Sequence, residues 1–346
     1  MLQIEKIQEL LSAGNVRENE PMSKHTTFRI GGDADIYIET VYIEELIDVI
    51  KYLRSENYPY FLMGNGSNIL VSDDGYRGAV ISTKCKKLPE KSLENDNVRD
   101  KHLLNDIKIF KDDNDSNNIL GREYIVENGY ACQDEIKGQT LVYAGSGVLL
   151  SKLASVMAEN ELQGFEFAGG IPGTLGGAVT MNAGAYGGEI KDVILGARVI
   201  TSSGDIKVLR ANELELGYRT SILQRDDMIV TDAVFAFEKG SRDEIVEKMN
   251  DFNQRRRDKQ PLEYGSAGST FKRPEGHFAG KLIQDAGLKG YRVGDVMVSD
   301  KHSGFVVNVG KGTCRQALEV IEHVQNQVME QFGVKLELEV KKLGQF

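Results

Sequence analysis

The chain has 346 residues, of which 40% are hydrophobic and 27% are charged, and its formal net charge is -10. These values are typical of a globular protein with two or three domains. A protein with this net negative charge does not attract the phosphate groups on which nucleic-acid binding depends. We therefore expect no nucleic-acid partner. No apolar run approaches the roughly 20 residues that span a bilayer, so we expect no membrane partner.

The start of the chain and the cysteines favour a cytoplasmic protein. The first 15 residues have the pattern of a charged amphipathic helix and not that of a signal peptide. Cys85, Cys132 and Cys314 lie far apart, without the spacing of a zinc site or a disulfide framework. We therefore expect reduced cysteines and no metal.

Hydrophobic periodicity predicts a small α+β unit at the start of the chain, ending near residue 84. Period-3.6 patterns predict helices over residues 3–12 and 42–55. Alternating or short apolar runs, bounded by Gly, Asn and Asp, predict strands at 34–39, 60–63, 69–71 and 79–82.

Residues 86–120 are polar and rich in Asn, Asp and Lys. A segment of this composition buries little apolar surface, so we interpret residues 86–138 as an insertion exposed to solvent. We expect at most a hairpin there, formed by residues 107–110 and 123–126. The alternative is an element that binds a partner.

From residue 141 onward, helical and strand patterns resume. Helices are predicted at 149–160, 242–257, 277–286 and 313–332. Strands are predicted at 197–202, 205–209, 228–238, 296–298, 305–309 and 335–340.

The chain contains 37 glycines, and two stretches concentrate them. In residues 64–68, GNGSN, backbone N–H groups and polar side chains converge as in an anion cradle. This is neither a P-loop nor a GxGxxG fingerprint, because no helix follows, and a plain tight turn is the alternative. Residues 164–188 combine many glycines with Ile, Pro, Leu, Val and Met, which indicates a packed segment that a ligand approaches closely.

Three shorter stretches carry charged or hydroxyl groups. Residues 217–221 (GYRTS) hold Arg219, which could equally be a surface residue. In residues 265–274, small residues leave Ser269 exposed, and two cationic residues, Lys272 and Arg273, follow. This arrangement suits the binding of an anionic ligand or the donation of a proton. The alternative is a simple turn with solvated basic residues. In residues 336–340, Glu337 and Glu339 share one strand face, which could be an acidic site or a hydrated surface.

Taken in order, these stretches resemble the UDP-N-acetylenolpyruvoylglucosamine reductase family. The resemblance rests on HTTFRIGG, GNGSNILVSD, GFEFAGGIPGTLGGAVTMNAGAYGGEI, GYRTS, KQPLEYGSAGSTFKRPEGHFAGKLIQDAGLKGYRVGD, VSDKHSGFVVN and LELEV. It covers nearly the whole chain apart from roughly 86–138. The chain looks like the shorter subtype, which lacks an extra substrate-closing loop.

The resemblance implies an α+β fold of the vanillyl-alcohol-oxidase type, with two FAD-binding lobes and an α+β substrate-binding domain. The first lobe would comprise residues 1–84 with 335–346, and the second residues 85–258. The substrate-binding domain would comprise residues 259–334.

The resemblance also assigns roles to residues. The FAD pyrophosphate would bind Gly64, Asn65, Gly66, Ser67 and Asn68. The flavin would be lined by Gly169, Ile171, Pro172, Gly173, Gly176, Gly177, Asn182, Gly184 and Ala185. Ser269 would be the general acid, and Arg219 and Glu339 would stabilise an enolate-like intermediate. The UDP-sugar would contact Tyr218, Lys259, Lys272 and Arg273.

The implied reaction is the reduction of UDP-N-acetylglucosamine enolpyruvate to UDP-N-acetylmuramate in peptidoglycan precursor synthesis, with non-covalent FAD and with NADPH as reductant. We expect a monomer. Two alternatives are another FAD-dependent oxidoreductase of the same fold and a non-catalytic protein that binds a UDP-sugar or a flavin.

Overall fold

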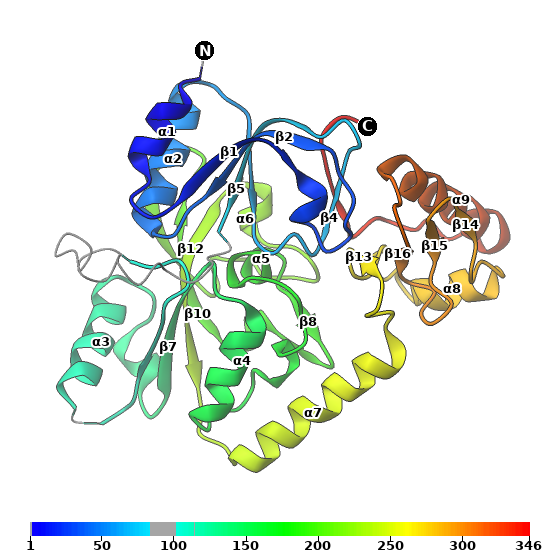
Figure 1. Cartoon of the computed structure of the whole chain (residues 1–346). Helices are drawn as coiled ribbons and strands as arrows, with labels where there is room; N and C mark the ends of the chain where they lie inside the picture. Colours follow the sequence, from blue (N-terminus) through cyan, green and yellow to red (C-terminus); the bar gives the residue numbers. More distant parts are fainter. Residues whose placement is uncertain (1, 84–101, 114) are drawn as a thin grey trace. The chain divides into compact units, whose positions relative to one another are not determined.

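The structure is a computed structural model that describes residues 2–83, 102–113 and 115–346 (Figure 1). Its mixture of helices and sheets confirms the predicted α+β class. The helices are α1 (Ile4–Leu10), α2 (Ile43–Ser55), α3 (Ser116–Glu127), α4 (Leu150–Glu159), α5 (Leu175–Thr180), α6 (Ile222–Arg225), α7 (Arg242–Lys259), α8 (Ala279–Asp285) and α9 (Cys314–Phe332). Among the described residues, none of these helices has the length and apolar content required to cross a membrane.

The strands form several sheets. They are β1 (Asn15–Pro21), β2 (Asp33–Glu39), β3 (Tyr60–Met63), β4 (Ile69–Val71), β5 (Tyr76–Ser82), β6 (Ile107–Phe110), β7 (Thr140–Gly145), β8 (Gly184–Ala185), β9 (Gly188–Glu189), β10 (Ile194–Ile200), β11 (Ile206–Arg210), β12 (Ile229–Phe237), β13 (Gly265–Ser266), β14 (Arg292–Val293), β15 (Val296–Val298), β16 (Val306–Asn308) and β17 (Lys341–Leu343). In the described chain their orders are β1-β2-β5-β3, β11-β10-β12-β7-β6, β13-β16-β15-β14, β17-β4 and β8-β9.

Contacts divide the chain into two compact units. The first comprises Met1–Val16, Ile38–Gly64 and Ile81–Asn253. The second comprises Arg17–Tyr37, Asn65–Val80 and Gln254–Phe346.

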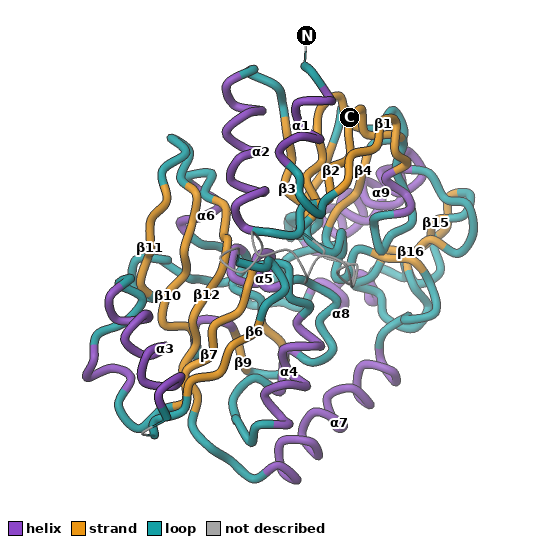
Figure 2. The backbone as a smooth tube through the Cα atoms, turned by 60° about the vertical axis from the view of Figure 1, so that its left-hand side comes forward, coloured by secondary structure: helices purple, strands orange, loops and turns teal. Residues whose placement is uncertain are grey.

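The antiparallel sheet β11-β10-β12-β7-β6 is the core of the first unit (Figure 2). Successive side chains of a strand point to opposite faces, so each strand serves two cores. Val142 and Phe235 pack in the same cluster as Leu153 of α4. On the other face, Tyr143 packs with Ile125 of α3. Because both faces are covered, β12 is buried almost throughout.

The prediction of a solvated insertion at 86–138 is wrong for the part that the structure describes. Residues 84–101 and 114 lie outside the described residues, but α3 and β6 follow, and Ile125, Tyr130 and Ile136 are buried. The predicted strand at 107–110 is confirmed as β6, whereas residues 123–126 belong to α3. Asp115 favours the helix because its side chain accepts hydrogen bonds from the backbone N–H groups of Asn117 and Asn118.

A buried polar network joins this region to the sheet. Asp232 is fully buried on β12, and its carboxylate accepts a hydrogen bond from the Tyr130 hydroxyl. Arg198 Nε donates to Asp232 Oδ2 over 2.7 Å, and Thr231 Oγ1 donates to the same oxygen over 2.9 Å. Burial, together with the neighbouring Asp232 charge, raises the pKa of Tyr130, so its hydroxyl remains a donor.

In the second unit, α9 packs against β14, β15 and β16 and against α8. It buries Val320, Ile321, Val324 and Val328 on one side. Thr313 caps its start, and Gly333, at φ 67°, ends it in the left-handed conformation. The Asp73 carboxylate also accepts from Cys314 N over 2.7 Å and from Arg315 N over 2.9 Å. The predicted helix at 313–332 is confirmed.

The last strand begins later than predicted. Residues 335–340 form only an isolated bridge, Phe271 with Leu338, and β17 starts at Lys341, where it pairs in parallel with β4. The expected alternation nevertheless holds, since Leu336 and Val340 are buried and Glu337 is exposed. The segment pairs first with residues 270–272 and then with β4, so it does not form one continuous strand.

The Arg198–Asp232 pair gives a prediction about stability. Arg198→Met is expected to lower the free energy of unfolding by about 3–5 kcal/mol, because it leaves a buried carboxylate without its charge partner. Urea unfolding followed by circular dichroism measures the change. The matched control is Arg225→Met, which breaks the exposed pair with Glu215 and is expected to cost about 0–1 kcal/mol. Equal losses in the two variants would show that the buried network does not stabilise the fold.

Candidate functional site

Within the first unit, Gly64, the first residue of one glycine stretch, meets the other stretch. Gly64 follows β3, and a Cβ added there would lie 2.1 Å from Oγ1 of Thr174, in the second stretch. Thr174 is buried and precedes α5. Glycine at position 64 therefore allows the backbone after β3 to approach the start of α5 more closely than any other residue would.

The turn after β7 closes on the same glycine stretch. Gly176 N donates to Ser146 O over 2.8 Å, and a Cβ at Gly176 would lie 2.9 Å from Ser146 Cβ. The Ser146 hydroxyl is buried and has no hydrogen-bond partner among the described residues. A buried hydroxyl without a partner costs free energy, which a ligand with a polar group could offset.

The predicted stretch around Arg219 docks on the glycine stretch as well. Asn182 Nδ2 donates to Gly217 O over 3.1 Å, and Arg219 donates to Gly184 O over 3.4 Å. Ser221 Oγ donates to Thr180 O over 2.6 Å. The first unit thus brings residues 217–221 and residues 180–184 together, although they are far apart in sequence.

Arg219 has a strained backbone and an aromatic neighbour. Its φ is 56°, in the left-handed region that non-glycine residues rarely adopt. Its guanidinium lies 5.3 Å from the ring centroid of Tyr218, whose side chain is exposed. Backbone strain of this kind clusters at ligand sites, where the surrounding structure determines the conformation.

The remaining predicted flavin residues lie along the same stretch of the first unit. Gly169, Ile171, Gly173, Gly184 and Ala185 are half-buried. Pro172 and Gly177 are exposed, and the nearest atom to a Cβ added at Gly177 would be Thr174 Oγ1 at 3.9 Å. The stretch therefore offers an open backbone surface at Gly177.

In the second unit, residues 65–68 form a tight loop whose shape depends on Gly66. Gly66 has a φ of 64°, and a Cβ there would lie 2.2 Å from the backbone oxygen of His25. Asn68 Nδ2 donates to Glu339 O over 3.0 Å, and Lys341 N donates to Asn68 O over 3.0 Å. The loop is thus tied to the C-terminal segment.

Ser269 lies on a turn that the same segment holds. Its side chain is exposed, and Gly268 before it has a φ of 75°. Thr270 N donates to Gly304 O over 2.9 Å, while Glu339 N donates to Thr270 O over 2.9 Å. Glu339 therefore bonds through its backbone both to the residue after Ser269 and to Asn68. The second unit brings the loop, Ser269 and Glu339 together.

Cationic groups accompany this turn. Lys272 Nζ lies 3.4 Å from Glu337 Oε2, and the Arg273 guanidinium lies 4.0 Å from the ring centroid of Phe278. Burial lowers the pKa of His302, and the charges of Lys289 and Lys259 lower it further. His302 is therefore neutral near pH 7, and Lys259 and Lys289 supply the positive charge around it.

Sequence reasoning missed several residues. Thr27, Thr174 and Lys289 lie inside motifs that carry the family resemblance but were assigned no role, and Ser146 lies outside those motifs. Their tertiary contacts are what distinguish them. The three predicted catalytic residues are divided, with Arg219 in the first unit and Ser269 and Glu339 in the second. Among the described residues, no group of three or more His, Cys, Asp and Glu side chains is arranged to hold a metal ion.

Comparison with known proteins first defines the class. Residues 127–210 match a family model described as an FAD binding domain, so the chain is a flavin-binding protein. This confirms the predicted cofactor class.

A second match is more specific. Residues 260–343 match the model of the UDP-N-acetylenolpyruvoylglucosamine reductase C-terminal domain. The reductase of that name from Lachnoclostridium phytofermentans is 46% identical over 99% of this chain and 97% of its own length. That from Caldanaerobacter subterraneus is 44% identical over 99% and 98%. The crystal structure of the Thermus caldophilus enzyme covers 95% of this chain and 99% of its own, with a TM-score of 0.69 and 30% identity. The chain belongs to the UDP-N-acetylenolpyruvoylglucosamine reductase family.

The residues present fit FAD. Gly177 leaves the main chain open to a dinucleotide, because the nearest atom to a Cβ added there would be Thr174 Oγ1 at 3.9 Å. The Ser146 hydroxyl provides a buried polar group that still lacks a partner within the described protein. Loops rich in backbone N–H groups suit the two negative phosphates. The family's cofactor is thus compatible with both glycine stretches.

Gly66 gives a prediction about cofactor binding. Gly66→Ala is expected to weaken FAD binding to the apoprotein by at least about tenfold. The left-handed backbone costs about 1–2 kcal/mol with a Cβ, and the His25 carbonyl cannot move aside as a side chain would. Quenching of flavin fluorescence measures the dissociation constant. The control Gly287→Ala has a similar φ of 74° but nothing within 4 Å of the added Cβ, so it should bind FAD normally. Normal binding by Gly66→Ala would exclude this loop from the cofactor site.

Proposed function

We propose that this protein reduces the enolpyruvyl group of UDP-N-acetylglucosamine enolpyruvate to the lactyl ether, giving UDP-N-acetylmuramate for peptidoglycan synthesis, with NADPH as the reductant. Support comes from membership of the reductase family along nearly the whole chain. The structural observation that supports the proposal is the backbone link from Glu339 to both Thr270 and Asn68, which ties the turn that carries Ser269 to residues 65–68. We propose that these residues bind the FAD pyrophosphate, and we call them the phosphate loop.

The reaction adds a hydride to one carbon of the double bond and a proton to the carbon beside the carboxylate. Two electrons pass from NADPH to the substrate, and NADP⁺ is the oxidised product. Bound FAD supplies the carrier for that hydride.

The protein's own residues handle the proton and the developing charge. Ser269 is exposed on a turn held at both sides, so its hydroxyl can donate a proton to a strongly basic carbanion. Arg219 stabilises the negative charge that develops on the carboxylate side, and its guanidinium is held by Gly184 O and Tyr218. Glu339 helps to stabilise the enolate-like intermediate in which this charge develops.

The remaining cations recognise the substrate. Lys272 and Arg273 follow Ser269 after two intervening residues, Thr270 and Phe271. The charges of Lys259 and Lys289 act on His302 and lower its pKa. A UDP-sugar carries two phosphate charges, which such a basic region attracts even though the whole chain is acidic. Tyr218 supplies an exposed aromatic ring beside Arg219. We place the enzyme in the cytoplasm, where these soluble substrates occur, and expect it to act as a monomer.

The experiment that tests this function is anaerobic. Purified protein should show a flavin spectrum that NADPH bleaches and UDP-N-acetylglucosamine enolpyruvate restores. Restoration by oxygen only would instead indicate an oxidase. Failure to bind FAD at all would overturn the proposal.

Ser269 gives a sharper prediction within that experiment. Ser269→Ala should leave bleaching by NADPH at its normal rate and slow restoration by the substrate about 10²–10⁴-fold, because only the second step needs the proton. Stopped-flow absorbance separates the two steps. Ser266→Ala, at the end of β13 just before that turn, is the control and should change neither rate strongly. A normal restoration rate in Ser269→Ala would refute the assignment of the acid.

A further inference from the structure

Thr27 contacts two predicted parts of the site within the second unit. Its backbone N donates to Gly66 O over 3.1 Å, and its backbone O accepts from Ser266 N over 3.1 Å. Its hydroxyl donates to Ser266 O over 2.7 Å and lies 3.4 Å from Gly66 O. One residue is therefore bonded to the phosphate loop on one side and to the strand that leads to Ser269 on the other.

The bond to Gly66 fixes how the loop presents its backbone. Gly66 O points toward Thr27, so in a planar trans peptide the N–H of Ser67 points the opposite way. The His25 carbonyl packs against Gly66 and limits any alternative conformation. A phosphate group that accepts a hydrogen bond from the Ser67 N–H would bind the same peptide group whose oxygen accepts from Thr27. The two hydrogen bonds would therefore polarise one peptide group and reinforce each other.

The bonds to Ser266 fix where the acid lies. Ser266 belongs to β13, and Thr270 is held by Gly304 O and, through its Oγ1, by Val306 N over 3.0 Å. Only residues 267–269 lie between these two anchors. A shift of Ser266 must therefore move Ser269, because a three-residue turn with fixed ends has little freedom.

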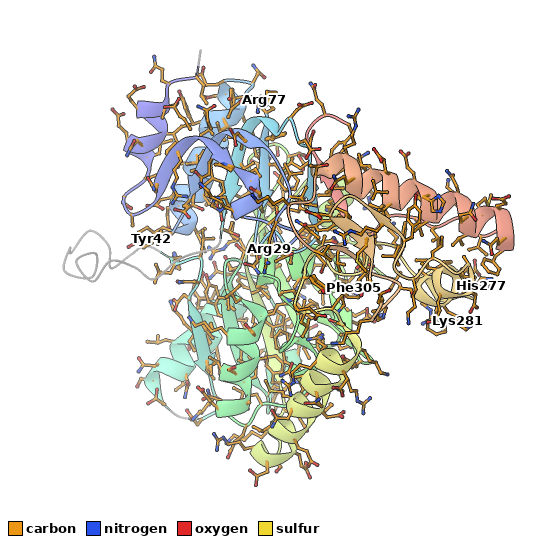
Figure 3. All side chains as sticks on the ribbon, turned by 45° about the vertical axis from the view of Figure 1, so that its right-hand side comes forward. Arg29, Tyr42, Arg77, His277, Lys281 and Phe305 are labelled. Atoms are coloured by element: carbon orange, nitrogen blue, oxygen red, sulfur yellow. The ribbon has the colours of Figure 1, made fainter. Side chains whose placement is uncertain are left out.

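The turn that carries Thr27 is itself fixed to the unit. Asn308 Nδ2 donates to Phe28 O over 3.2 Å, and Phe28 is buried in the core that contains Ala267. Arg29, which ends this turn at a φ of 57°, and Phe305, which precedes β16, are labelled in Figure 3. Since Phe28 anchors the main chain, the Thr27 hydroxyl can be removed without releasing the turn.

We propose that Thr27 is a positioning residue that couples occupation of the phosphate loop to the placement of Ser269. The proposal rests on the proposed function. When the cofactor binds, it restricts the motion of residues 65–68. The hydrogen bond from the Thr27 hydroxyl to Ser266 then restricts the motion of residues 266–270 as well.

Hydrogen exchange measured by mass spectrometry tests this coupling without using activity. In the wild-type apoprotein, added FAD should slow amide exchange in peptides covering residues 64–70 and also in those covering 266–272. Thr27→Val should keep the protection of residues 64–70 and lose that of residues 266–272 by about fivefold to tenfold, the equivalent of one hydrogen bond. Thr27→Ser keeps the hydroxyl and should behave as wild type.

The matched control is Thr26→Val. Thr26 is the adjacent buried threonine, and its hydroxyl donates to Ile30 O over 3.1 Å, so the variant loses a similar bond that touches neither Gly66 nor Ser266. It should retain protection in both regions. Stopped-flow kinetics should agree, with substrate-driven reoxidation slowed in Thr27→Val alone and reduction by NADPH unchanged.

Three outcomes would overturn the proposal. The first is protection of residues 266–272 that persists in Thr27→Val, and the second is its loss in Thr26→Val as well. The third is that FAD protects only residues 64–70 from exchange in the wild-type protein. This last result does not depend on whether any variant folds. Wild-type protein that binds no FAD would instead contradict the proposed function, so the two failures are distinguishable.

Discussion

The backbone hydrogen bonds of the C-terminal segment hold together the part of the site that lies in the second unit. Glu337 O accepts from Lys272 N, Glu339 N donates to Thr270 O, and Lys341 N donates to Asn68 O. These bonds join three stretches that are widely separated in sequence. Because these bonds involve peptide groups, they join the turn that carries Ser269 to the loop at residues 65–68 whichever side chains the segment carries.

Close backbone approach is the second constraint, and it explains where glycine is needed. Gly64 faces Thr174, Gly66 faces the His25 carbonyl, and Gly176 faces Ser146, in each case at a distance too short for a Cβ. These are positions where the surrounding atoms cannot give way easily. The glycines at 187 and 287, by contrast, have nothing within 4 Å and reflect local turn geometry only.

The region after residue 101 shows how tertiary packing can override composition. Its polar residues predicted solvent exposure, yet Tyr130 reaches the buried Asp232 and Ile125 packs under the sheet. Asn and Asp stabilised structure here as helix caps, as Asp115 does for α3. Strand β1, with the sequence NVRENEP, was not predicted, because its polar, half-buried residues give no alternating apolar pattern.

The sequence by itself determined the α+β class, most helices and strands, the family and the identity of the motifs. Local periodicity and ordered short motifs carry that information, since they depend on neighbouring residues. Only the tertiary structure decided that Gly64 meets Thr174, that Arg219 docks on Gly184, and that Glu339 joins Asn68 to the Ser269 turn. These contacts arise between residues up to 271 positions apart, where packing of whole elements, and no local pattern, sets the distance.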